Sequence, residues 1–148
     1  MLDLLVKARL PSLQRSVRKV VLQPQFVKLR FVKNLREKNV FRIRQVFTTH
    51  TKNCVYLLFC SKCGVKYVGE TRNTLSVRMF QHRHNIRNHK ETDTPLVQHF
   101  LLHGLEAMRV AGLQKDASWT TQDRRRKERL WIYLLGTREP WGLNCGRE

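Results

Sequence analysis

Five side chains in this sequence have the types and the spacing that hydrolysis of a phosphodiester bond requires. Tyr56 and Tyr67 flank a short segment that a hairpin can close, so both hydroxyls can face one cleft. Arg78 and His82 are four residues apart and therefore lie on one face of a helix. Glu128 is the single acid in a run of basic residues. Arginine stabilises charge on a phosphate, histidine transfers protons, and one carboxylate suits a Mg²⁺ ion that keeps most of its waters. The set predicts metal-assisted cleavage of a phosphodiester.

Each of these motifs also has a more ordinary explanation. Two tyrosines on a hairpin usually pack against each other across the strands. An arginine and a histidine one helical turn apart usually form a solvated face, and a glutamate among cations is usually an ion-pair partner. Only the five residues together, in this order, favour catalysis. The lack of a second carboxylate beside Glu128 favours one metal ion over a two-metal site.

The pattern of apolar and turn residues predicts the elements that would position these side chains. We expect strands over residues 55–59, 66–69 and 108–113, and helices over residues 75–88, 95–102 and 120–136. Thr120 and Asp123 resemble a capping box at the start of the last helix. The tail, residues 140–144, is expected to form a loop that lies back on the domain. These elements predict a small α/β domain with a three-stranded, mainly antiparallel sheet flanked by helices.

The N-terminal third of the chain differs from the rest in composition. Residues 1–47 hold twelve Lys and Arg against Asp3 and Glu37, so they carry +10 of the net charge of +18. Their apolar spacing predicts one or two short basic amphipathic helices before Pro24, followed by a weakly ordered stretch. We therefore divide the chain into a basic N-terminal arm or linker, residues 1–52, and a compact domain, residues 53–148. A mitochondrial transit peptide is an alternative for the first 22 residues, because the segment is rich in Arg and poor in acids.

The composition limits the class of partner. The 148 residues are about one domain, and 29 Lys and Arg face 11 Asp and Glu. A net charge of this size disfavours a compact state unless a polyanion relieves it, and nucleic acid is the polyanion that the charge favours. A merely soluble basic surface or a membrane-surface binder is the alternative. No apolar run is long enough to span a bilayer, and no hydrophobic signal segment is present. We therefore expect no membrane partner and no small-molecule substrate.

The motifs together resemble the GIY-YIG endonuclease superfamily. The resemblance rests on Val55-Tyr56, on Tyr67-Val68-Gly69 and on the later catalytic positions, and it covers about residues 53–145. The phrases at residues 67–71, 126–132 and 140–144 look most like the endonuclease domain of Penelope-like retroelements. Two positions depart from the family pattern: Cys54 stands where the family name has its first glycine, and Glu70 stands where many relatives carry a basic residue.

The resemblance implies a Mg²⁺-dependent endonuclease that cuts DNA, with a catalytically inactive nucleic-acid-binding fragment as the alternative. It makes Tyr67 the better candidate for positioning or deprotonating the attacking water, with support from Tyr56. We expect Arg78 and a bound cation to lower the pKa of the reacting phenol from its usual value near 10. Glu128 would hold the Mg²⁺, and Asn144 would order the substrate or the cleft. The expected location is the nucleus, with the mitochondrion as the alternative; the sequence does not predict the oligomeric state.

A second metal site is expected at the tip of the hairpin. Cys60 and Cys63 have zinc-knuckle spacing, and His99 and His103 have the spacing of the other half of a Cys2His2 site. Cys54 is excluded as a ligand, because six residues of extended strand, about 20 Å at roughly 3.3 Å each, separate it from Cys60. Two buried thiols and two ordinary helix histidines are the alternative. Four cysteines without a secretory signal favour such a metal site over disulfides.

Overall fold

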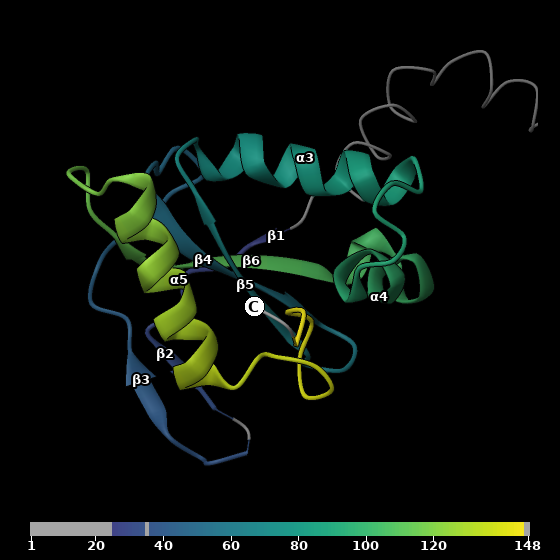
Figure 1. Cartoon of the computed structure of the whole chain (residues 1–148), viewed down its shortest axis with the longest axis horizontal. Helices are drawn as coiled ribbons and strands as arrows, with labels where there is room; N and C mark the ends of the chain where they lie inside the picture. The colour runs from purple at the N-terminus through teal and green to yellow at the C-terminus, as the bar shows by residue number, and fades with distance from the viewer. Residues whose placement is uncertain (1–24, 35, 147–148) are drawn as a thin grey trace, which may run out of the picture.

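The computed structural model describes residues 25–34 and 36–146, which form a twisted sheet with helices packed around it (Figure 1). The sheet has the strand order β1-β6-β4-β5. Its strands are β1 (Gln25–Phe26), β4 (Cys54–Cys60), β5 (Lys66–Thr71) and β6 (Met108–Lys115). The helices are α3 (Leu75–Arg87), α4 (Pro95–His103) and α5 (Thr121–Leu135), and a 3-10 turn, η1, spans Leu105–Ala107. The expected α/β fold, with its mainly antiparallel sheet and its three helices, is confirmed. The sheet has four strands and not the expected three, because the short β1 pairs with β6 at the edge.

The central strand is β4, and its sequence explains its place. All but one of its seven residues are buried, as expected of a strand with a neighbour on each edge and layers on both faces. It pairs antiparallel with β5 on one side and with β6 on the other. The connection to β5 is tight: Gly64 adopts φ +76°, and its N–H donates to the Cys60 carbonyl at 2.7 Å. The positive φ is one that glycine adopts without strain.

The helix boundaries follow from local capping. Thr74 and Thr94 each accept a hydrogen bond from the backbone N–H three residues later, and Pro95 occupies the first turn of α4. At the start of α5, Thr120 and Asp123 form the reciprocal capping box that the sequence predicts. Gly136 ends this helix in the left-handed conformation, at φ 62°. None of the helices in the described part of the chain combines the length and the hydrophobicity that a bilayer crossing demands.

The segment before residue 53 packs more closely on the domain than the sequence predicts. Strand β1 pairs parallel with β6, and a two-stranded hairpin is formed by β2 (Phe31–Lys33) and β3 (Val40–Arg42). Val32, Ile43 and Phe47 are buried in the same hydrophobic core as the sheet. The expectation of a weakly ordered stretch is therefore wrong for residues 25–34 and 36–52. The predicted amphipathic helices before Pro24 lie outside the described residues.

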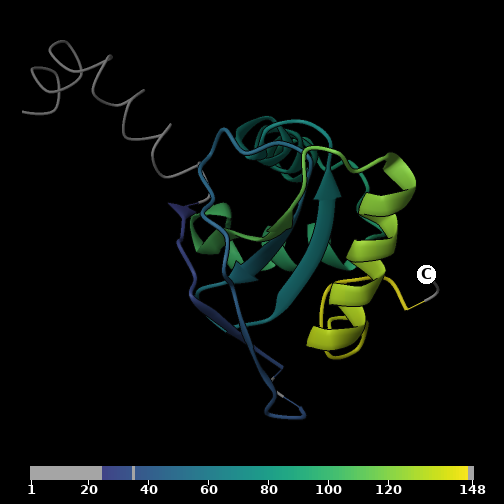
Figure 2. The same ribbon diagram turned by 90° about the vertical axis from the view of Figure 1, so that its left-hand side faces the viewer.

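The hairpin projects from the body of the molecule next to α5 in two perpendicular views (Figures 1 and 2). Its anchor is Asn34, whose side-chain N–H donates to the Leu134 carbonyl at 2.9 Å. The linker behind the hairpin is held to β6 by Gln45, whose side chain makes two hydrogen bonds with the Lys115 backbone, each 2.9 Å long. The hairpin is thus attached at the C-terminal end of α5, and the linker at the end of β6.

Candidate active site

A hydrogen-bonded network joins β4, the first strand of the β4–β5 hairpin, to α3. Tyr56 is fully buried, and its hydroxyl lies 2.7 Å from Nε2 of His82 and 3.1 Å from Nε of Arg78. A guanidinium can only donate, so the Tyr56 oxygen accepts a hydrogen bond from Arg78, and the Tyr56 O–H donates one to His82. Arg78 also donates through Nη1 to Gln81 at 2.9 Å. The two helical residues expected on one face therefore meet one of the two tyrosines.

Burial sets the protonation states of this network. Burial raises the pKa of Tyr56 well above its usual value, and the nearby Tyr67 adds to this effect against the opposing charge of Arg78. Burial, together with the charge of Arg78, lowers the pKa of His82 to about 3. At neutral pH the phenol therefore keeps its proton and the imidazole is neutral. Tyr56 therefore donates a hydrogen bond to His82 and accepts one from Arg78, and it is not a phenolate base.

The register of the hairpin brings the second tyrosine to the same face of the sheet. Tyr56 is opposite Gly69 and Leu58 is opposite Tyr67, so all four positions share one face. A Cβ at Gly69 would overlap the Tyr56 hydroxyl and ring. Position 69 therefore requires glycine, because the Tyr56 ring packs against its Cα and leaves no room for a side chain. The Tyr67 ring lies edge-on to that of His82, with centroids 5.8 Å apart.

Tyr67 opens onto a cleft of about 190 Å³. Its lining combines side chains from the hairpin, from α3, from α5 and from the C-terminal tail. Among the residues predicted from sequence it includes Tyr67, Arg78, His82, Glu128 and Asn144. Tyr56 lies behind the cleft and reaches it only through its hydrogen bonds. The structure thus gathers all six predicted catalytic residues in or directly behind one cleft.

Asn144 acts on the cleft through the backbone of β5. Its side chain pairs with Val68 like an added strand residue: Nδ2 donates to the Val68 carbonyl at 2.8 Å, and Oδ1 accepts from the Val68 N–H at 2.9 Å. Oδ1 also accepts from the Thr137 hydroxyl at 2.7 Å. Asn144 therefore holds the C-terminal tail against the strand that carries Tyr67. The expectation that it orders the cleft fits this geometry better than direct contact with substrate.

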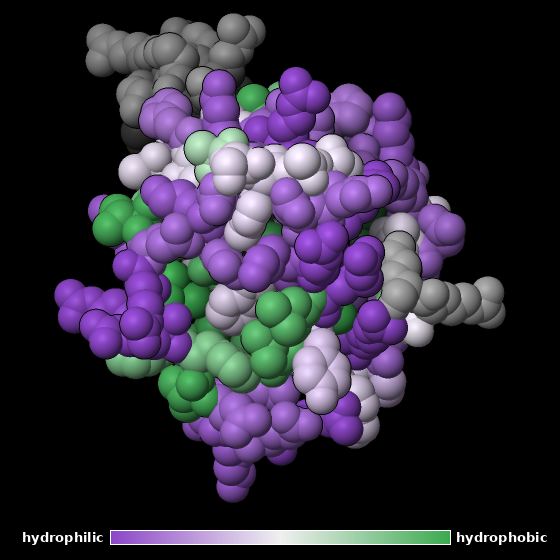
Figure 3. Space-filling model, turned by 60° about the vertical axis from the view of Figure 1, so that its left-hand side comes forward, coloured by the Kyte–Doolittle hydropathy of each residue, from purple (hydrophilic) through white to green (hydrophobic). Residues whose placement is uncertain are grey.

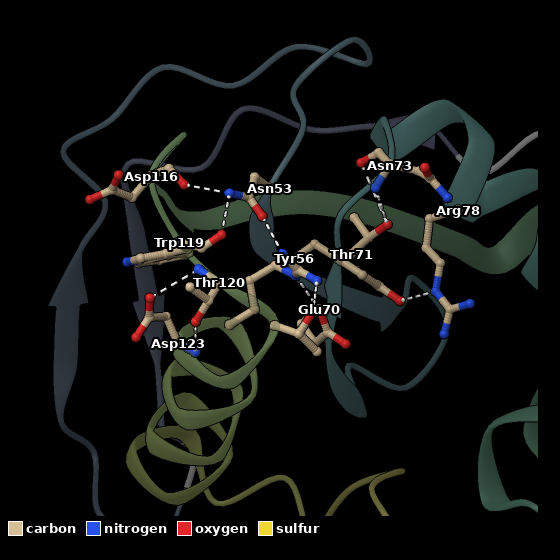
Figure 4. A network of polar contacts seen from close by, with 12 residues as sticks. Asn53, Tyr56, Glu70, Thr71, Asn73, Arg78, Asp116, Trp119, Thr120 and Asp123 are labelled. Atoms are coloured by element: carbon tan, nitrogen blue, oxygen red, sulfur yellow. Dashed lines mark hydrogen bonds and ion pairs between the residues drawn. The ribbon is translucent and has the colours of Figure 1, made fainter.

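An ion pair that the sequence does not reveal docks α5 on the hairpin (Figure 4). Arg124 is buried, and its Nε donates to Glu70 at 2.8 Å. Its two other nitrogens donate to Asn53 and to Thr121. The carboxylate of Glu70 is thus committed to Arg124.

Cys54, the other departure from the family pattern, is buried at the start of β4, where burial raises the pKa of its thiol to about 12.

Glu91 is a second carboxylate in the lining of the cleft. It lies between α3 and α4 with φ 53°, and it accepts a hydrogen bond from Asn85 at 3.2 Å. Nothing in the sequence marks it, because it is 37 positions away from Glu128 and belongs to no motif. Glu128 is therefore the single acid in its own stretch of sequence, whereas the cleft contains two carboxylates, Glu91 and Glu128.

The structure brings the four expected ligands of the second metal site together. One ligand atom from each of Cys60, Cys63, His99 and His103 lies within 4.8 Å of the others. Two of the S–N distances, Cys60 to His103 and Cys63 to His99, are 3.5 Å. A tetrahedral ion with metal–sulfur bonds near 2.3 Å and metal–nitrogen bonds near 2.0 Å separates its ligand atoms by roughly 3.3–3.8 Å. The group can therefore hold a metal ion.

The second metal group links the hairpin tip to α4. Burial lowers the pKa of His99, with a further contribution from the charge of His103, so its imidazole is available as a neutral ligand. The strand from Cys54 to Cys60 is unbroken, and Cys54 does not belong to the group. Cys54 therefore lies apart from the four side chains that could hold an ion, as its distance along the strand predicts.

Comparisons with known proteins agree with this geometry. Residues 52–144, more than half of the chain, match the family model of the GIY-YIG catalytic domain. Among solved structures, the chain is similar to the catalytic domain of the homing endonuclease I-TevI, with a TM-score of 0.57 and 18% sequence identity. The similarity covers 64% of this chain and 99% of that chain. No curated protein matches the chain. The chain therefore belongs to the GIY-YIG catalytic domain family, which implies a nuclease.

Proposed function

We propose that this chain is a Mg²⁺-dependent endonuclease that hydrolyses DNA phosphodiester bonds. The observation that carries the proposal is the single cleft lined by Tyr67, Arg78, His82 and Glu128. The family match to a nuclease domain supports it. The net charge of +18 supports a polyanionic substrate. We infer a retroelement origin, close to the Penelope-like endonucleases, from the resemblance of the sequence phrases alone.

Each residue has a role that follows from its contacts. Tyr67 faces the cleft and is the proposed residue that positions the attacking water or removes its proton. Arg78 is held in place by Tyr56 and Gln81, so its charge is fixed where a phosphate would be attacked. His82 is neutral and accepts a hydrogen bond from the Tyr56 hydroxyl, which makes the pair a rigid support for Tyr67 and Arg78.

Glu128 is the proposed ligand of the Mg²⁺ ion. It is half-buried on α5 and lines the cleft, and a single carboxylate is a common protein share in a Mg²⁺ site completed by waters and substrate phosphate. A bound Mg²⁺ would supply Lewis-acid stabilisation of the phosphate.

We propose Zn²⁺ as the ion of the Cys60, Cys63, His99 and His103 group. Two thiolates and two imidazoles form a donor set of structural zinc sites, and the 3.5 Å spacings fit its tetrahedral geometry. The ion would join α4 to the hairpin that carries both tyrosines, and so preserve their register.

The basic segment, residues 1–47, is proposed to add nonspecific affinity for DNA. The nucleus is the proposed location, with the mitochondrion as the alternative.

The test is incubation of the purified chain with supercoiled plasmid, with Mg²⁺ and with excess chelator. The proposal expects nicked or linear plasmid only when Mg²⁺ is present. A chain that retards plasmid on a gel and never cuts it would favour the inactive nucleic-acid-binding fragment. Cleavage that continues in chelator would contradict the metal dependence.

A further inference from the structure

A second groove lies apart from the catalytic cleft, between the β2–β3 hairpin and the C-terminal tail. It consists of two adjoining hollows of about 440 and 200 Å³ at the C-terminal end of α5. Both hollows are lined by Asn34, Arg36, Gly136 and Trp141. None of the residues that line this groove also lines the catalytic cleft. The lining of the groove includes Lys66, the neighbour of Tyr67 on β5, so the two sites are adjacent along one strand.

The lining combines exposed aromatic rings with cations. Tyr133 is 80% exposed and Trp141 is 60% exposed, and the guanidinium of Arg36 lies 4.4 Å from the centre of the Trp141 ring. Arg138 and Lys66 also line the groove. The acid among the lining residues is Glu37, which accepts a hydrogen bond from Asn39. Figure 3 shows a face on which hydrophobic side chains gather in the lower half and are surrounded by hydrophilic ones.

The groove is preformed, because its walls are tied to the domain. Oδ1 of Asn34 accepts from the N–H groups of Arg36 and Glu37, and its Nδ2 donates to the Leu134 carbonyl, which fixes the hairpin on α5. The opposite wall is the tail that Asn144 holds against Val68. A ligand would not have to order these walls, so less of its binding energy would be lost.

We propose that this groove binds an unpaired stretch of nucleic acid beside the cleavage site. The bases would stack on Trp141 and Tyr133, and the phosphates would contact Arg36, Arg138 and Lys66. Exposed aromatic rings among cations form the platform that proteins use for single strands, whereas bases within a duplex are already stacked on each other. The excess of cations in the lining favours a polyanion over an apolar peptide. The proposal rests on the proposed endonuclease function, and it adds that the preferred substrate carries an unpaired segment.

The test measures the affinity of the full-length chain for a fluorescent single-stranded oligonucleotide of about 15 nucleotides by anisotropy. Trp141→Ala should weaken binding roughly 5- to 150-fold, the equivalent of one lost stacked base, and Trp141→Phe should retain most of the affinity. Arg36→Ala should also weaken binding and lower its salt dependence. Leu102→Ala is the matched control, because this apolar side chain is 83% exposed on α4 and lies outside the groove.

Two further measurements separate this proposal from its alternatives. Displacement of the oligonucleotide by poly-glutamate as effectively as by unlabelled single strand would overturn the stacking role, because a peptide has no bases. Plasmid nicking is measured on the same proteins. A wild type that nicks plasmid, with unchanged single-strand affinity in Trp141→Ala and Tyr133→Ala, would overturn the groove and leave the endonuclease intact. A chain that binds single strands through Trp141 and never nicks would support the groove and contradict the endonuclease.

Discussion

His82 should make the stability of this protein depend on pH in the acid range. The folded chain keeps His82 neutral down to a pKa of about 3, whereas the same side chain in the unfolded chain takes up a proton near pH 6.5. Below about pH 6.5 the unfolded state binds more protons than the folded state, so the free energy of unfolding falls as the pH falls. Well above pH 6.5 the His82 side chain is neutral in both states and causes no change. Between pH 7 and pH 5 the loss due to His82 is about 2 kcal/mol.

The assay is urea unfolding of the wild type and of His82→Gln at these two pH values. Glutamine does not titrate, and its amide oxygen can still accept a hydrogen bond from the Tyr56 hydroxyl. The other histidines are the same in both proteins, so their contributions cancel in the comparison. The variant should lose about 2 kcal/mol less than the wild type on acidification. Equal losses would refute the reasoning, because they would mean that His82 titrates in the folded protein as it does in the unfolded chain.

Three further substitutions test the β4–β5 hairpin, the ion pair that joins α5 to it, and the proposed zinc site. Gly69→Ala should lower the free energy of unfolding by about 1–3 kcal/mol, because its Cβ overlaps the Tyr56 ring; Gly146→Ala is the control, and equal stability of both variants in urea would contradict the close contact. Glu70→Gln should cost about 1–3 kcal/mol by removing the charged partner of buried Arg124, measured by urea unfolding, and a variant as stable as wild type would exclude this role for the ion pair. Elemental analysis should find about one zinc ion per chain in the wild type and in Cys54→Ser, and none in Cys63→Ser; zinc retained by Cys63→Ser would overturn the ligand set.

The parts of the fold that the sequence predicts are those with strong local signals. Thr74, Thr94 and Thr120 cap the first turns of the three helices. The capping box of Thr120 and Asp123 is the cap that the sequence predicts. The β4–β5 hairpin is predictable because two β-rich runs flank a turn that contains Gly64. The cysteine and histidine pairs were predictable for a similar reason, since their short spacings are typical of metal ligands.

The parts that the sequence does not predict depend on contacts between distant residues. Strand β1 has only two residues and shows no periodicity, so its pairing with β6 leaves no local pattern. The anchor from Asn34 to the end of α5 spans 100 positions. The protonation of Tyr56 depends on complete burial between the sheet and α3, which neither the type nor the spacing of the residue reveals.

The most direct test of the central claim is plasmid nicking by Glu128→Gln in Mg²⁺, beside the wild type and the control Glu139→Gln, which removes the same charge from an exposed position. Glu128→Gln should abolish nicking and bind DNA with equal or slightly higher affinity, because one negative charge is lost. Glu139→Gln should cut like the wild type. A Glu128→Gln protein that nicks plasmid at the wild-type rate would contradict the assignment of this carboxylate to the metal.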